Sequence, residues 1–233
     1  LPRGHATGES THDAFPGTAA EGVPVKATVT TNPDSGILTI DLSDNVDCLP
    51  NGINLSEASA RSAALIGAFN ALPVHLPVNG GSLRRFKVIL RQGSAVGIPN
   101  DQTSCSLATT NLADRVINAV HLAFAQISDQ LGMAEMGAIE GPVGAVISGF
   151  DPRRGNRPYI NQLALAGTAG AAGPQANGWL TMGNAGTAGM WKMDSIEITE
   201  LDFPLIVNKR MLVTDTEGAG TYTGAPSCLV EYE

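Results

Sequence analysis

An alternation of apolar and polar residues predicts a β-hairpin in the first part of the chain. Residues 23–31 and 37–42 both have strand composition, and the segment 32–36 between them is a turn signal, because proline fixes φ and glycine tolerates positive φ. Another alternating run, over 83–91, predicts a further strand. The residues before the hairpin, 1–22, have no period, and we expect an extended segment that lies over a surface.

Two stretches carry apolar residues at helical spacing. The first runs over 54–72, with Asn54 as its expected N-cap and Glu57 reaching back from the third helical position. Its faces are almost all apolar or small, which indicates burial on more than one side. The second helix is expected to begin at the cap residue Asn111 and to end before Gly132, a position typical of a helix C-terminus.

Beyond Gly137, strand composition alternates with glycine-rich loops. The expected strands are 143–148, 159–165, 195–199, 205–208, 211–214 and the last six residues, 228–233. Residues 166–190 hold seven glycines together with Trp179, and we expect an ordered loop system there. The pattern predicts an α+β fold: a mixed, mostly antiparallel β-sheet with two main packed helices and long glycine-rich loops, forming a single domain over 23–233.

The composition narrows the classes of function. Charged residues make up 15% of the chain, against roughly 25% in an average globular protein, and the net charge is -8. Such a chain lacks the basic face that nucleic-acid binding requires, and no apolar run is long enough for a membrane span. Low charge combined with 27 glycines is typical of a surface that partner chains cover, although small polar residues would also explain it.

Cysteine and histidine spacing provides no metal or nucleophile motif. Cys48, Cys105 and Cys228 stand far apart without a CxxC pair, and no signal-peptide core is visible, so a reducing cytoplasm is the expected location. Cys105 precedes a helix but has no histidine near it in sequence, so an unreactive thiol is favoured. None of the four histidines has ligand spacing, and a packed or surface role is favoured for His121.

Amide side chains remain as candidate chemistry. Asparagine is common in turns and caps for backbone reasons, which accounts for at least half of those present; the rest could line a polar pocket for an amide or carboxylate group. Two capped helix starts also offer oriented N–H groups to an anionic intermediate, although ordinary capping is the favoured interpretation of each. The candidate substrate-binding residues are Asn51, Asn54, Asn79, Asn111, Arg115 and Asn184, and no catalytic residue is identified.

Taken in order, several segments resemble the hydantoinase B/oxoprolinase family. They are Ile40-Asp41-Leu42-Ser43-Asp44, Asn51-Gly52-Ile53-Asn54 before an Ala/Ser-rich helix, Pro77-Val78-Asn79-Gly80-Gly81, the helix start 110–116, the glycine-rich stretch 167–178, and the pair 200–205 and 217–222. The resemblance is collinear from about Val23 to Gly224. Two departures are Asn177-Gly178, where the family usually has Asp-Gly, and Thr223-Gly224-Ala225 in place of Arg-Gly-Gly.

The resemblance implies one part of a two-subunit, ATP-dependent enzyme. A hydantoinase A-type partner subunit, with ATP and Mg, phosphorylates the oxygen of an inert cyclic amide such as a hydantoin, a lactam or 5-oxoproline. The subunit that this chain resembles then completes hydrolysis. Family members are longer, and a divalent metal is expected in the part absent here. We therefore expect no metal in this chain and no activity from these residues alone.

Two other functions stay open at this point. A related branch of the family carboxylates ketones such as acetone or acetophenone with ATP. A non-catalytic scaffold that holds the active subunit is the alternative from a different class. In each case we expect the chain to be bound to the remainder of its own polypeptide or to the ATP-using subunit.

Overall fold

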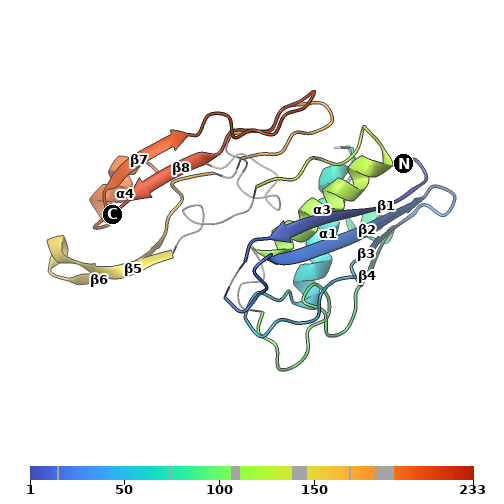
Figure 1. Cartoon of the computed structure of the whole chain (residues 1–233), viewed down its shortest axis with the longest axis horizontal. Helices are drawn as coiled ribbons and strands as arrows, with labels where there is room; N and C mark the ends of the chain where they lie inside the picture. Colours follow the sequence, from blue (N-terminus) through green and yellow to red (C-terminus); the bar gives the residue numbers. More distant parts are fainter. Residues whose placement is uncertain are drawn as a thin grey trace. The chain divides into compact units, whose positions relative to one another are not determined.

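Figure 1 shows the computed structural model of the chain, which describes residues 1–14, 16–73, 75–105, 111–137, 146–167, 169–180, 182 and 192–233. The chain divides into two compact units: Leu1–Ala138 with Gly173–Gln175, and Ile139–Ala172 with Ala176–Glu233. The boundaries expected from the sequence, 1–22 and 23–233, do not coincide with this division. The predicted α+β class is confirmed by helices and several mostly antiparallel sheets.

A four-stranded sheet in the order β1-β2-β3-β4 forms one layer of the first unit. Its strands are β1 (Gly4–His12), β2 (Val23–Asn32), β3 (Ile37–Asp41) and β4 (Phe86–Ile89). The first three are antiparallel, and β4 runs parallel to β3. Strands β2 and β3 confirm the predicted hairpin, and every second residue of β2 is buried, as the alternation requires.

Strand β1 replaces the unpatterned extended segment that the sequence analysis expected over 1–22. It pairs with β2 over its whole length, from Gly4 opposite Thr31 to His12 opposite Val23. The period of two is present, but its buried positions at the end of the strand are glycine, serine and histidine. A hydrophobic pattern cannot reveal a strand whose inward residues are small or polar.

Two helices confirm the predicted pair, and α1 (Glu57–Ala71) and α3 (Leu112–Ile127) pack against each other beside the sheet (Figure 1). Helix α3 also packs on β1 and β2. The cap of α1 differs from the expectation, because the side chain of Ser56, not Asn54, accepts the N–H of Ser59. A short helix, α2 (Gly80–Leu83), precedes β4 where strand was expected from residue 83.

The described residues of the second unit form two hairpins and a helix. Strands β5 (Val146–Asp151) and β6 (Arg157–Gln162) pair around the 3-10 turn η2 (Pro152–Arg154), and β7 (Val207–Leu212) pairs with β8 (Cys228–Tyr232). Leu163, Leu165 and Leu205 form its buried core, against which Ile147, Phe203, Val207 and Val230 pack. Among the described helices, none combines the length and apolar character that crossing a bilayer requires.

The predicted strand over 195–199 is wrong, because these residues begin helix α4 (Ile196–Asp202). The alternation of Ile196 and Ile198 with polar neighbours imitates a strand. The side chain of Ser195 instead caps the helix by accepting the N–H of Ile198. Glu197 stands in the first turn, where a negative charge favours a helix N-terminus.

His121 lies inside the first unit, on α3, in agreement with a packed role. Its side chain is 3% exposed, and Nε2 has no hydrogen-bond partner within the described residues. Burial lowers the pKa of His121 from 6.5 to about 4, because the charged ring would lose its hydration. The ring is therefore neutral in the folded protein near neutral pH.

We predict that His121→Leu weakens the pH dependence of stability below neutrality. The unfolded His121 binds a proton below pH 6.5, whereas the folded ring stays neutral down to about 4, so the stability of the wild type falls as pH falls through this window. The full difference corresponds to about 3 kcal/mol. Urea unfolding of both proteins at neutral and at acidic pH measures it. Equal losses in the two proteins would contradict the assignment.

Candidate functional site

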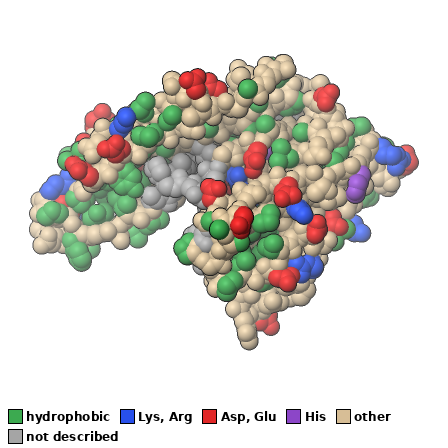
Figure 2. Space-filling model, viewed as in Figure 1, with side chains coloured by type: hydrophobic (Ala, Val, Ile, Leu, Met, Phe, Trp, Pro, Cys, Tyr) green, Lys and Arg blue, Asp and Glu red, His purple; other side chains and the backbone are tan. Residues whose placement is uncertain are grey.

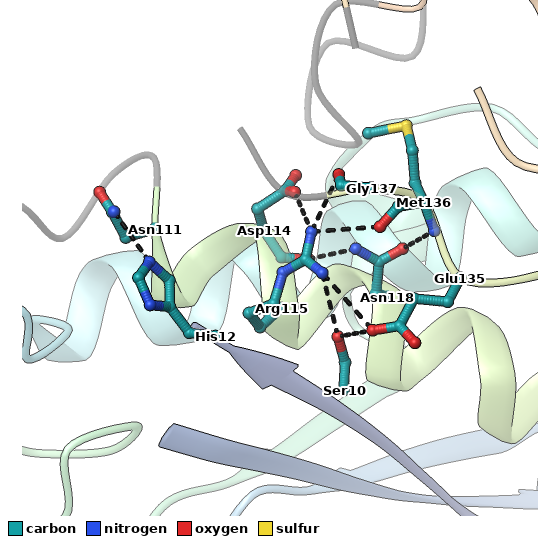
Figure 3. A network of polar contacts seen from close by, with 9 residues as sticks. All are labelled: Ser10, His12, Asn111, Asp114, Arg115, Asn118, Glu135, Met136 and Gly137. Carbon is teal, nitrogen blue, oxygen red and sulfur yellow. Dashed lines mark hydrogen bonds and ion pairs between the residues drawn. The ribbon is translucent and has the colours of Figure 1, made fainter. Parts of the chain in front are cut away.

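A buried polar cluster surrounds Arg115 near the N-terminal end of α3 (Figure 3). The Nη2 atom of Arg115 donates to Asp114 Oδ2 at 2.8 Å and to the carbonyl oxygens of Met136 and Gly137 at 3.3 and 3.2 Å. Its Nη1 atom donates to Ser10 Oγ and to Glu135 Oε1, each at 3.4 Å. Ser10 also donates to Glu135. The cluster thus joins β1, α3 and the loop after α3.

The charges in this cluster are paired inside the protein. The side chains of Asp114 and Arg115 are each 4% exposed, whereas that of Glu135 is 45% exposed. Because a buried charge needs a partner, the guanidinium and the Asp114 carboxylate hold each other in place. Both terminal nitrogens of Arg115 are engaged by protein acceptors. The arrangement fits a residue that fastens residues 135–137 to the helix.

Asn118 completes the attachment of the same loop, although it was not among the candidates. It is fully buried, its Nδ2 donates to Asp114 O at 3.2 Å, and its Oδ1 accepts the N–H of Met136 at 2.9 Å. A helical signal for it exists in the sequence, since positions 111, 114, 115 and 118 lie on one helix face. Ser10, His12 and Glu135 carry no such local signal.

Asn111 contacts the end of β1 and does not cap its helix in the expected way. It occupies the N-cap position of α3 without a side-chain capping bond, and its Nδ2 lies 2.9 Å from Nε2 of His12. His12 is 2% exposed, and its Nδ1 lies 2.7 Å from the carbonyl of Asp13. Because a carbonyl only accepts and an amide nitrogen only donates, Nδ1 donates to Asp13 and Nε2 accepts from Asn111.

Asn54 closes the loop that leads into α1. Its Oδ1 accepts the N–H of Leu49 at 2.7 Å, and its Nδ2 donates to the carbonyls of Leu49, Asn51 and Ser104 at 2.9, 2.7 and 3.1 Å. The residue is fully buried, so these contacts satisfy both ends of its amide. These partners of the Asn54 side chain are all backbone groups, so the residue stabilises the loop before α1.

Asn51 lines a surface hollow of about 820 Å³ in the first unit. Four amide side chains border this hollow, namely Asn51, Gln92, Asn100 and Gln102, and Asp101 adds a carboxylate. The Nδ2 of Asn51 donates to the carbonyl of Pro16 at 3.0 Å. The hollow thus presents hydrogen-bond donors and acceptors of the kind that match a planar amide or a carboxylate.

The remaining candidates are Asn79 and Asn184, and Asn79 belongs neither to the Arg115 cluster nor to the hollow bordered by Asn51. Asn79 is exposed and caps α2, with its Oδ1 accepting the N–H groups of Gly81 and Ser82 at 2.9 and 3.1 Å. Asn184 lies outside the described residues. The cluster and the hollow each have a contact with the chain at the end of β1. His12 contacts Asn111 beside the cluster, and the carbonyl of Pro16 contacts Asn51 in the hollow.

The Arg115 cluster does not have the donor set of a divalent cation site. Asp114 and Glu135 are both ion-paired to Arg115, so a guanidinium stands between the two carboxylates. Within the described residues, no group of three or more His, Cys, Asp or Glu side chains is arranged to hold a metal ion. The chemistry available here is hydrogen bonding, positioning and exclusion of water.

Comparison with known proteins places the chain in a family. The model of the family described as hydantoinase B/oxoprolinase matches residues 1–233. The chain is 26% identical over 186 residues to the caprolactamase subunit beta of Pseudomonas jessenii, a match that spans 79% of this chain and 32% of that protein. The chain therefore spans about a third of the length of this curated relative.

Two solved structures share the fold. The ATP-dependent caprolactamase from Pseudomonas jessenii matches all of this chain and 39% of its own, with a TM-score of 0.81 and 23% identity. The nucleotide-free structure of acetone carboxylase matches 97% of this chain and 31% of its own, with a TM-score of 0.69 and 17% identity. The match of the family model along the whole sequence shows that the chain belongs to the hydantoinase B/oxoprolinase family.

Proposed function

We propose that this chain is part of a subunit of an ATP-dependent enzyme that opens a cyclic amide after the amide oxygen has been phosphorylated. The observation that carries the proposal is the family match over the whole chain, together with the sequence likeness to a caprolactamase subunit. The fold likeness to a caprolactamase supports it. The substrate class is a hydantoin, a lactam or 5-oxoproline.

The chemistry explains why such an enzyme needs ATP. A planar, resonance-stabilised amide is a poor electrophile, and phosphorylation of its oxygen provides a leaving group before water attacks. A hydantoinase A-type partner subunit would bind ATP and Mg and transfer the phosphoryl group. A divalent metal would be held by the part of the family protein outside these residues. The activated intermediate must be shielded from bulk water until it reacts.

Within this scheme, the chain's own residues have binding and positioning roles. The hollow bordered by Asn51 offers amide groups that can hydrogen-bond an amide or carboxylate. Asn54 stabilises the loop that carries Asn51 through four hydrogen bonds to backbone groups. Arg115 and Asn118 hold residues 135–137 against α3, and Asn111 holds the end of β1. We regard these four as positioning residues.

Exposed apolar side chains in the second unit support the proposed assembly with other chains (Figure 2). In the β5–β6 hairpin, Val146, Phe150 and Ile160 are 64%, 68% and 74% exposed. The strand register places all three on one face of the hairpin, because Ser148 pairs with Ile160 and Phe150 pairs with Pro158. A partner surface that covers this face would be the remainder of the polypeptide or the ATP-using subunit.

Carboxylation of a ketone is the second candidate function, favoured by the fold likeness to acetone carboxylase. Product analysis of the assembled complex distinguishes the two reactions. With ATP and a lactam, hydantoin or 5-oxoproline, the proposal predicts a ring-opened product and ADP. With ATP, bicarbonate and acetone or acetophenone, it predicts no carboxylated product. The reverse result would assign the chain to the carboxylase branch.

The scaffold alternative is tested by turnover of the same complex. Asn111→Ala removes the contact with His12 and should lower turnover, because the start of α3 and the end of β1 lose their link. Asn79→Ala is the matched control, since this exposed residue caps only the short helix α2. If both variants leave turnover unchanged, the result supports a non-catalytic scaffold.

A further inference from the structure

Two of the three cysteines belong to segments that border the amide-lined hollow. Cys48 lines the hollow, and Cys105 directly follows Ser104, which also lines it. Both thiols are half-buried and unpaired. The third cysteine, Cys228, is also half-buried and belongs to strand β8 of the second unit.

Asn54 holds the two cysteine-bearing segments beside each other. Its single Nδ2 donates to the carbonyl of Leu49, next to Cys48, and to the carbonyl of Ser104, next to Cys105, at 2.9 and 3.1 Å. Two oxygens that share one donor at these distances lie within about 6 Å of each other. The carbonyl groups next to the two cysteines therefore lie close together, although the residues are distant in sequence.

An electrostatic interaction between the thiols agrees with this arrangement. Burial raises the pKa of the Cys105 thiol above 9.0, and the charge of Cys48 raises it further. Because such an interaction weakens with distance, it is in line with the closeness of the two segments that Asn54 joins. The raised pKa also keeps the thiolate fraction of Cys105 small, which disfavours Cys105 as the first thiol to attack.

We propose that Cys48 and Cys105 form a dithiol that a small disulfide, such as oxidised glutathione, converts into an intrachain disulfide. The Cys48 thiolate attacks one glutathione sulfur, breaks its S–S bond and releases one glutathione thiolate. The Cys105 thiolate then attacks the Cys48 sulfur and displaces the second glutathione. The protein loses two protons and two electrons, and oxidised glutathione gains them as two thiols. The bond fastens both loops that border the hollow.

Peptide mapping of the intact protein tests this pairing. After treatment with oxidised glutathione, blocking of free thiols and trypsin digestion without reductant, Cys48 lies in peptide 27–61, Cys105 in 92–115, and Cys228 in the peptide that starts at Met211. We expect a linked species of 27–61 with 92–115 that dithiothreitol separates. Separate glutathione adducts on these peptides, links to the Cys228 peptide, or full retention of both thiols would overturn the proposal.

Single variants provide the matched controls. In Cys105→Ser, the glutathione adduct on Cys48 should accumulate at least about tenfold above the wild-type level, because no second thiol displaces it. Cys228→Ser should leave the 27–61 to 92–115 link unchanged. An adduct on Cys48 that is equally abundant in the wild type and in Cys105→Ser would show that Cys105 does not resolve it.

Discussion

Replacing Arg115 with methionine is expected to lower the free energy of unfolding by about 3–5 kcal/mol, the usual result of breaking a buried ion pair. The variant leaves the Asp114 carboxylate, 4% exposed, without its cation. The carbonyls of Met136 and Gly137 lose their donors at the same time. Urea unfolding of the purified protein, followed by far-UV circular dichroism, measures the change.

Two further variants make this test specific. Arg61→Met removes an exposed ion pair with Glu57 on α1 and should lower stability by no more than about 0.5 kcal/mol. Asp114→Leu combined with Arg115→Met should recover part of the loss, because the double variant strands no buried carboxylate. If Arg115→Met is as mild as Arg61→Met, the cluster does not hold the fold together.

The second large effect is expected from Gly8→Ala on strand β1. A Cβ atom at Gly8 would lie 2.0 Å from the carbonyl oxygen of Ala119 and 2.7 Å from the backbone nitrogen of Ala123. Backbone atoms of α3 cannot move aside as a flexible side chain can, so β1 must separate from the helix. We expect a loss of about 3 kcal/mol or more, at the upper end for overpacked sites.

Gly80→Ala is the matched control for this substitution. A Cβ atom there would have only Arg84 Nη1 nearby, at 3.9 Å, at the end of a flexible side chain. The residue opens helix α2, where alanine also lowers the entropy of the unfolded chain, so stability should stay the same or rise slightly. Thermal unfolding of both variants decides the matter. Equal midpoints would contradict the close contact between β1 and α3.

The sequence predicts those parts of the fold whose inward positions are apolar. The hairpin of β2 and β3 follows from alternation and a turn signal, and helix α3 follows from its apolar spacing. Strand β1 is not predicted from the sequence, because its buried positions are occupied by Gly8, Ser10 and His12. Helix α4 is predicted as a strand, because the alternating isoleucines resemble a strand pattern and the cap residue Ser195 is not recognised. Local patterns fail where small or polar residues perform the packing.

The candidate site was predictable only in part, for a related reason. Spacing places Asn111 and Arg115 on one face of a helix, and the structure keeps them there. Their partners Ser10, His12 and Glu135 come from segments distant in sequence, and only the tertiary structure brings them together. Asn54 and Ser56 both have cap chemistry, and the choice between them depends on the loop contacts that engage Asn54.

The transfer of oxygen from the substrate to phosphate is the most direct test of the proposed function. The assembled complex would receive ATP and a lactam whose carbonyl carries a heavy isotope of oxygen. If the amide oxygen is phosphorylated and then leaves with the phosphoryl group, the label must appear in inorganic phosphate, and both oxygens of the new carboxylate must come from water. Mass spectrometry of the released phosphate measures this transfer. The account predicts labelled phosphate in proportion to ring opening, and ring opening with unlabelled phosphate would contradict it.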